Sequence, residues 1–232
     1  MKTKELMETW RNYMESKPKS RIIVFLDMDG VLVGFTKGLV TVLNKDISSN
    51  IEYPRSRGKK LEKLRNYEGI DKVFPITEEF MRELMRKKDA KEELTQWELL
   101  IKRYQFAPVT KNYDHWAKLP KAPGADQLIQ QCFNLVGEEN VYILSAPVDD
   151  ESIKAKKYWL TNNTPIPPER IFIRQDKSSI PPLFPGARCI LIDDREKYTT
   201  MFESSGGKGI IHFPPASLAG VNNSLATLES LI

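Results

Sequence analysis

The chain has 232 residues, of which 41% are hydrophobic and 28% charged, a composition typical of a globular protein and too apolar for a disordered one. Lys and Arg exceed Asp and Glu by 35 to 31, and this mild basicity favours small anionic ligands without indicating nucleic acid. No apolar run approaches the roughly 18 residues of a membrane span, and residues 1–20 lack the apolar centre of a signal peptide. We therefore expect a cytoplasmic protein with no membrane partner.

Cysteine and histidine are too scarce for two common kinds of structural site. The two cysteines, Cys132 and Cys189, lie in apolar segments far apart, which predicts buried free thiols rather than a disulfide framework. The two histidines, His115 and His212, are also far apart, and a zinc site needs more His and Cys at closer spacing.

The chain begins with an amphipathic pattern over residues 3–16 that predicts a helix. Short runs of branched apolar residues follow at 21–27, 141–145, 171–174, 189–193 and 209–213. Strands buried on both faces of a parallel sheet have this composition. Helical patterns alternate with them at 125–135, 150–161, from about 195, and at 218–231. This order predicts an α/β fold with a Rossmann-like, doubly wound parallel sheet.

Residues 36–116, called the insert below, separate the first two predicted strands and have a helical, highly charged pattern. A structureless connection of that length is implausible in a compact domain. We therefore predict a Rossmann-like catalytic core of residues 1–35 and 117–232 with a helical cap inserted after the first strand. The densest basic run, residues 55–60, is better explained as a solvated loop and helix start than as a nucleic-acid patch.

Polar side chains end the predicted strands, and in an open parallel sheet ligands bind beyond the carboxyl ends of the strands. Several carboxylates crowded there need a cation to offset their repulsion. Oxygen donors without nearby His or Cys favour Mg²⁺, which commonly bridges carboxylates to a phosphate. The sequence thus predicts a Mg²⁺ site and a phosphate-ester substrate from these strand-end residues: Asp27, Asp29, Ser145, Arg174, Asp176, Lys177, Asp193 and Asp194.

The same residues resemble the haloacid dehalogenase-like (HAD) phosphatase superfamily in order and spacing: the DMDGV run that starts at Asp27, then Ser145, Lys177 and the pair Asp193-Asp194. The stretches VFLDMDGVLVGF, HWAKLPKAPGA, YILSAP, RQDK and LIDDRE look like the 5′(3′)-deoxyribonucleotidase family. With their connecting helices they cover most of 21–36 and 114–200, whereas the insert matches only in place and approximate length. The resemblance implies Mg²⁺-dependent hydrolysis of nucleoside monophosphates by a Rossmann-like core under a helical cap.

Chemistry and resemblance assign roles to the first strand end. Asp27 is the candidate nucleophile, which would form an aspartyl-phosphate near Mg²⁺. Asp29 would protonate the leaving alcohol and then activate the hydrolytic water. Gly30 would allow a tight turn that leaves the Asp29 carbonyl free to bind the metal. The alternative, a strand-end turn that caps the next helix, suits one Asp but not both.

The other strand ends complete the predicted site. Ser145 and the backbone N–H of Ala146 would bind phosphate oxygens; the alternative for Ser145 is a helix N-cap. The family usually has a second hydroxyl at the position of Ala146. Asp193 and Asp194 would complete the metal site, and the resemblance favours Asp194 as the direct ligand. Arg195 is expected to pair with these acids.

Three cations and several aromatic residues are further candidates. Lys177 would offset charge on the nucleophile and the transferring phosphate, and Arg174 is a weaker phosphate contact. By resemblance, Lys156 matches a family lysine, with a solvated surface lysine as the alternative, and Phe35 falls where the family places an aromatic against the substrate. Five aromatic residues of the insert are considered, and most of them are expected in its own core: Tyr53, Tyr67, Phe74, Trp97 and Tyr104. His115 and Trp116 are also expected to pack.

These observations predict an enzyme, a phosphoric monoester hydrolase acting on nucleoside 5′-monophosphates, ribose or deoxyribose, through an aspartyl-phosphate. One alternative is the same chemistry on a sugar phosphate or a nucleic-acid 3′-phosphate end. An open, basic cleft would favour the nucleic-acid end, and a closed, aromatic one the nucleotide. Another is a non-catalytic binding protein, against which the intact pair Asp27 and Asp29 argues. The expected partner is a small phosphomonoester rather than nucleic acid, and the sequence is compatible with a homodimer.

Overall fold

The computed structural model describes residues 21–232 except 50–51, 53–54 and 71–73, so the helix predicted over 3–16 and the side chain of Tyr53 lie outside the described part. Its centre is a five-stranded sheet in the order β3-β2-β1-β4-β5, in which every pairing is parallel. The predicted Rossmann-like, doubly wound α/β class is confirmed. The strands are β1 (Ile22–Leu26), β2 (Val141–Ser145), β3 (Ile171–Ile173), β4 (Arg188–Asp193) and β5 (Lys208–Ile211).

Both faces of the sheet are covered, which explains the uninterrupted apolar runs of its strands. In β1, Val24 and Leu26 point to one hydrophobic cluster, and Ile23 and Phe25 point to a second on the opposite face. The first cluster includes residues of α7 (Ala125–Val136), α8 (Asp150–Asn163) and α10 (Leu218–Leu231). The second includes residues of α9 (Glu196–Glu203) and of the segment around η4 (Lys177–Ser179) and η5 (Pro181–Leu183). The predicted buried free cysteines are confirmed, one in each cluster.

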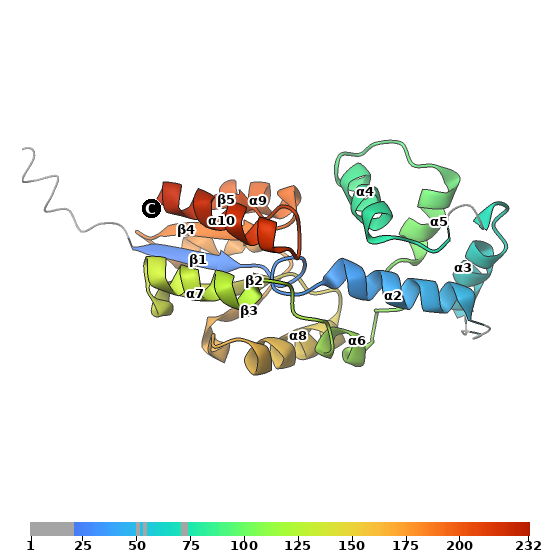
Figure 1. Ribbon diagram of the computed structural model, residues 1–232, viewed down its shortest axis with the longest axis horizontal. Coiled ribbons are helices and arrows are strands. Elements are labelled where there is room, and N and C mark those ends of the chain that lie inside the picture. Colours follow the sequence, from blue (N-terminus) through green and yellow to red (C-terminus); the bar gives the residue numbers. More distant parts are fainter. Residues whose placement is uncertain (1–20, 50–51, 53–54, 71–73) are drawn as a thin grey trace, which may run out of the picture.

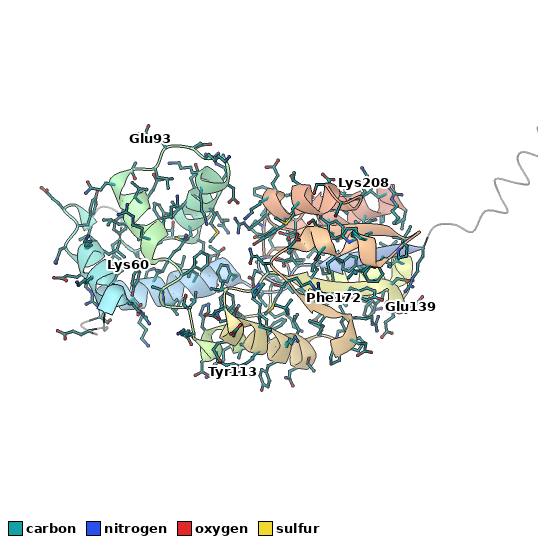
Figure 2. All side chains as sticks on the ribbon, turned by 180° about the vertical axis from the view of Figure 1, so that it is seen from behind. Lys60, Glu93, Tyr113, Glu139, Phe172 and Lys208 are labelled. Atoms are coloured by element: carbon teal, nitrogen blue, oxygen red, sulfur yellow. The ribbon has the colours of Figure 1, made fainter. Side chains whose placement is uncertain are left out.

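The insert contains helices grouped beyond the carboxyl ends of the strands, on the right in Figure 1. They are α2 (Phe35–Ser48), α3 (Arg55–Arg65), α4 (Glu78–Asp89) and α5 (Gln96–Tyr104), whereas α6 (Tyr113–Ala117) lies beside α8. In Figure 2, Lys60 and Glu93 mark this group, while Glu139 and Lys208 mark the far end of the sheet. Residues 55–60 form the start of α3, with Lys59 and Lys60 exposed. The division into a core and a cap stays a proposal.

Two backbone segments connect the insert to the sheet, and they run side by side. The Gly34 amide donates to the Pro120 carbonyl (2.9 Å), and the Ala122 amide donates to the Leu32 carbonyl (2.8 Å). The insert is therefore held at the carboxyl edge of the sheet by a pair of adjacent connections.

No helix in the described part of the chain is long and apolar enough to cross a membrane.

Candidate active site

The loop after β1 places two acids beyond the sheet. The Asp27 amide continues the β1–β4 ladder by donating to the Ile192 carbonyl (2.9 Å). Gly30 then adopts a φ of +78°, and a Cβ at this position would lie 2.1 Å from Oδ2 of Asp194. Only glycine therefore lets this backbone approach the carboxylate of the neighbouring strand end so closely.

Three carboxylates meet where β1 and β4 end. Asp27, Asp193 and Asp194 each offer an oxygen, and these three oxygens all lie within 4.8 Å of one another. Both oxygens of Asp193 are engaged: Oδ1 accepts from the Arg195 amide (2.9 Å) and Oδ2 from Lys177. The carboxylate of Asp194, by contrast, has no hydrogen bond or ion pair among the residues that the structure describes.

A buried lysine holds the nucleophile candidate. Lys177, in η4 after β3, is fully buried, and its Nζ donates to Oδ1 of Asp27 (2.8 Å) and Oδ2 of Asp193 (2.5 Å). The Tyr198 ring lies 4.7 Å from the same nitrogen. Burial alone would lower the pKa of Lys177, but the charges of Asp193 and Asp27 raise it above its ordinary value. Lys177 is therefore a permanent cation.

A second buried lysine holds the other acid. Lys156 reaches from α8, and its Nζ donates to Oδ2 of Asp29 (2.6 Å), the Ala146 carbonyl (2.7 Å) and Oγ of Ser145 (3.1 Å). The alternative of a solvated Lys156 is wrong, because its side chain is completely buried. The N-cap alternative for Ser145 is also wrong, because Asp149 caps α8 by accepting from the Ser152 amide.

Negative charge is in excess at this centre. Burial raises the pKa of Asp194 well above its ordinary value, and the charges of Asp193, Asp27 and Asp29 raise it further. Oδ1 of Asp29 is buried without a hydrogen bond, and no described residue donates to the Asp29 carbonyl. Carboxylate and carbonyl oxygens left free in this way are the donor set of a hard divalent cation. The residues therefore fit Mg²⁺.

The acids form the floor of a cavity of about 340 Å³ between the insert and the core. Its wall on the insert side is aromatic, with Phe35, Phe106 and Trp116. Phe35 stacks on Trp116 (centroids 5.3 Å apart, planes at 9°) and on Phe106 (6.5 Å, 18°). A larger hollow of about 540 Å³, between α2 and residues 108–114, contains none of the predicted site residues.

An ion pair crosses the cavity from α4 to the start of α9. The Arg195 guanidinium donates to both oxygens of Asp89 (2.8 and 2.7 Å). The expected pairing of Arg195 with the neighbouring acids is therefore wrong for its side chain, because Asp89 of the insert lies within reach of the guanidinium. This ion pair joins the insert to the core at the cavity itself, whereas a second one, between Asp114 and Lys118 (2.9 Å), joins them at the exposed end of the insert.

Most predicted site residues come together. Those that line the cavity are Asp27, Asp29, Phe35, Ala146 and Asp194, and Lys156, Lys177, Ser145 and Asp193 lie directly behind them. Arg174 does not join them: its amide donates to the Ser145 carbonyl (2.8 Å), but its side chain is exposed and outside the cavity lining. The short helix η4 begins at Lys177, three residues after Arg174, and the buried side chain of Lys177 is the one that enters the site.

The structure adds cavity residues outside the quoted motifs, among them Met85, Gln105, Phe106 and Tyr198, and also Gln175, which lies within the RQDK stretch but was not singled out. Trp116 is buried and its Nε1 donates to the Val109 carbonyl (3.0 Å), which confirms packing, yet its ring also lines the cavity. The aromatic residues predicted for the core of the insert and described here do pack there: Tyr67, Phe74, Trp97 and Tyr104. Helical periodicity identified a core side for these helices but could not show which residues face the sheet.

No protein-family model matches the chain, and no curated protein matches it either. Among solved structures, it is similar to the haloacid dehalogenase-like family hydrolase SP0104 from Streptococcus pneumoniae, with 10% identity, 92% of this chain and 100% of that one covered, and a TM-score of 0.48. A protein described as a haloacid dehalogenase-like hydrolase from Burkholderia xenovorans LB400 is 14% identical, with 84% and 83% covered and a TM-score of 0.45. Likenesses this remote say nothing about the reaction that this chain performs.

Proposed function

We propose that this protein is a Mg²⁺-dependent phosphatase of the HAD type that hydrolyses nucleoside 5′-monophosphates. The observation that carries the proposal is a pair of carboxylates on one cavity floor, each held by its own buried lysine. Lys177 lies 2.8 Å from Asp27, and Lys156 lies 2.6 Å from Asp29. A site that only bound an anion would not need two acids on its floor, whereas a two-step hydrolysis needs both.

In the first step, an oxygen of Asp27 attacks phosphorus while the bond from phosphorus to the leaving oxygen breaks. Lys177 offsets the negative charge that Asp27 and the phosphate share. Asp29 gives its proton to the leaving oxygen. Burial raises the pKa of Asp29, the Lys156 ammonium opposes this, and the charge of Asp27 adds to it, so the net shift favours the protonated form that this step uses.

In the second step, Asp29 takes a proton from a water molecule that attacks phosphorus, and the bond to Asp27 breaks to release phosphate. Lys156 holds the Asp29 carboxylate in place for both transfers. Ala146 lines the cavity next to Ser145, which supports these two residues as phosphate contacts.

Mg²⁺ would be held by Asp27, Asp194 and the Asp29 carbonyl, with Asp193 behind them. When bound, it supplies positive charge that offsets the excess of carboxylates and helps orient the phosphate. Because both oxygens of Asp193 already accept hydrogen bonds, Asp194 is the better direct ligand.

The leaving group is proposed from the rest of the cavity. The near-parallel rings of Phe35, Trp116 and Phe106 give the cavity an aromatic, apolar lining suited to a planar base. Stacking of a base on an aromatic ring is worth roughly 1–3 kcal/mol. The resemblance to the 5′(3′)-deoxyribonucleotidase family agrees with this substrate class, with the insert acting as the cap.

Phosphate release from a panel of monoesters, with Mg²⁺, tests the proposal. We expect nucleoside 5′-monophosphates to exceed hexose phosphates and deoxyribose 5-phosphate by roughly tenfold or more in kcat/KM. Phe35→Leu should shrink this margin, whereas Phe133→Leu on α7, half-buried and away from the cavity, should not.

Other outcomes are informative. A panel led by sugar phosphates would keep the phosphatase and refute the nucleotidase. A preference for 3′-phosphorylated oligonucleotides would favour the nucleic-acid-end alternative, and residues 55–60 would then be mutated first. Absence of phosphate release from every ester would refute both.

A further inference from the structure

One polar side chain interrupts the aromatic wall of the cavity. Gln105 follows α5 directly; it is only 2% exposed and lines the cavity beside Phe106. Its backbone is held in place, because its backbone N–H donates to the Ile101 carbonyl (2.7 Å) and α5 begins with a capping box between Thr95 and Glu98. The side-chain amide of a buried glutamine requires hydrogen-bond partners for both its NH₂ group and its oxygen.

The side chain of Gln105 has only one partner, and a weak one. Nε2 donates to the Lys102 carbonyl at 3.4 Å, whereas Oε1 is buried and accepts no hydrogen bond from any described residue. Rotating the amide by 180° would set Oε1 against the Lys102 carbonyl oxygen, so that two acceptors would face each other. The group without a partner is therefore the acceptor Oε1, on a residue that lines the cavity.

We propose that Gln105 is a specificity-determining residue whose Oε1 accepts a hydrogen bond from an N–H group on the edge of the substrate's base. This inference rests on the proposed nucleotide phosphatase. The floor acids and lysines recognise only the phosphate, so selection of the leaving group falls to cavity residues outside the floor. Stacked rings that suit a planar face and an unpaired acceptor that suits an N–H edge together describe a nucleobase.

Two pairs of substrates test the role of Gln105 without disturbing the protein. Purine riboside 5′-monophosphate is AMP without its 6-amino group, and 3-methyl-UMP replaces the N3–H of UMP by a methyl group. In the wild-type enzyme, kcat/KM should fall by roughly tenfold to a hundredfold within at least one pair, because the analogue leaves Oε1 unpaired. Equal rates within both pairs would overturn the proposal.

Gln105→Met keeps the size of the side chain and removes the amide. In this variant the parent nucleotide of the sensitive pair should be hydrolysed as slowly as its analogue, while turnover of p-nitrophenyl phosphate stays within about twofold of the wild type. Gln131→Met, at an exposed position on α7, is the matched control and should keep the full discrimination. A uniform loss on all substrates would mean that Gln105 acts structurally and would overturn the proposal.

The proposal and the function on which it rests fail in different ways. If nucleotides exceed deoxyribose 5-phosphate but neither pair discriminates, only the role of Gln105 is refuted. If nucleotides show no advantage over deoxyribose 5-phosphate, the nucleotidase is refuted and the role of Gln105 with it. If Gln105→Met does not fold, the substrate pairs on the wild-type enzyme still decide.

Discussion

Replacing Asp27 by Asn tests the proposed chemistry, because an amide cannot form the acyl-phosphate. Uncatalysed hydrolysis of phosphate monoesters is extremely slow, so that enzymes supply up to about 10²¹-fold acceleration. Nothing else in the cavity is placed to replace covalent catalysis on that scale. We expect Asp27→Asn to lose nearly all turnover of every substrate in the panel.

The structure also predicts that this variant folds with nearly wild-type stability. At an effective dielectric constant of about 20, the attraction between Asp27 and Lys177 at 2.8 Å is roughly 6 kcal/mol. Repulsion from the oxygens of Asp193 and Asp194, which lie no more than 4.8 Å away, is at least roughly 3.5 kcal/mol each, or about 7 kcal/mol together. Attraction and repulsion are therefore of the same order, so neutralising residue 27 should shift Tm by only a few degrees.

The assay is phosphate release with Mg²⁺ between pH 5.5 and 8, accompanied by thermal unfolding of the same preparation. Asp126→Asn is the matched control, because the side chain of Asp126 is 70% exposed and pairs with Lys121 at the surface. A folded Asp27→Asn protein that keeps more than a tenth of the wild-type kcat would refute covalent catalysis by this residue. A large loss of stability would refute the charge balance instead.

Three further predictions concern the metal, the pH and the ion pair across the cavity. EDTA should abolish activity, Mg²⁺ should restore it and Ca²⁺ should support it poorly. Asp194→Asn should raise the Mg²⁺ concentration needed for half-maximal activity at least about tenfold. Full activity after exhaustive chelation would contradict the metal site. Burial raises the pKa of Asp193 to about 6, with Lys177 opposing and Asp27 adding to the shift, above roughly 3.9 in the unfolded chain. The folded state therefore favours the protonated acid, so this stabilisation is complete below about pH 4 and is lost as the pH rises through about 6. Tm in EDTA should therefore fall between pH 4 and 6, and a Tm that rises over this interval would show the opposite linkage. Asp89→Asn removes a partly exposed ion pair with Arg195, so we expect a stability loss below about 1 kcal/mol. Because this pair holds the cavity closed, we also expect a severalfold higher KM for the preferred nucleotide, and an unchanged KM would contradict that role.

The sequence alone was sufficient for the sheet and for the acids at its edge. Runs such as Ile22–Leu26 are apolar at every position, and this is required only where both faces of a strand are covered. Because parallel strands end at the same edge, Asp27 and Asp194 could be expected to meet although 167 residues, 194 − 27, separate them. These expectations follow from local composition and from a general property of parallel sheets.

The tertiary structure decided which groups neutralise, bury and enclose those acids. The sequence pattern of its helix is compatible with either a solvated or a buried Lys156. Only the packing of α8 beneath the insert brings its Nζ to Asp29, 127 residues away in the chain. Gln105 and Arg195 likewise follow from how the insert lies over the sheet, which sets the aromatic wall, the unpaired amide oxygen and the link to Asp89. Partners of this kind depend on the relative placement of distant helices, a property that no local pattern of residues specifies.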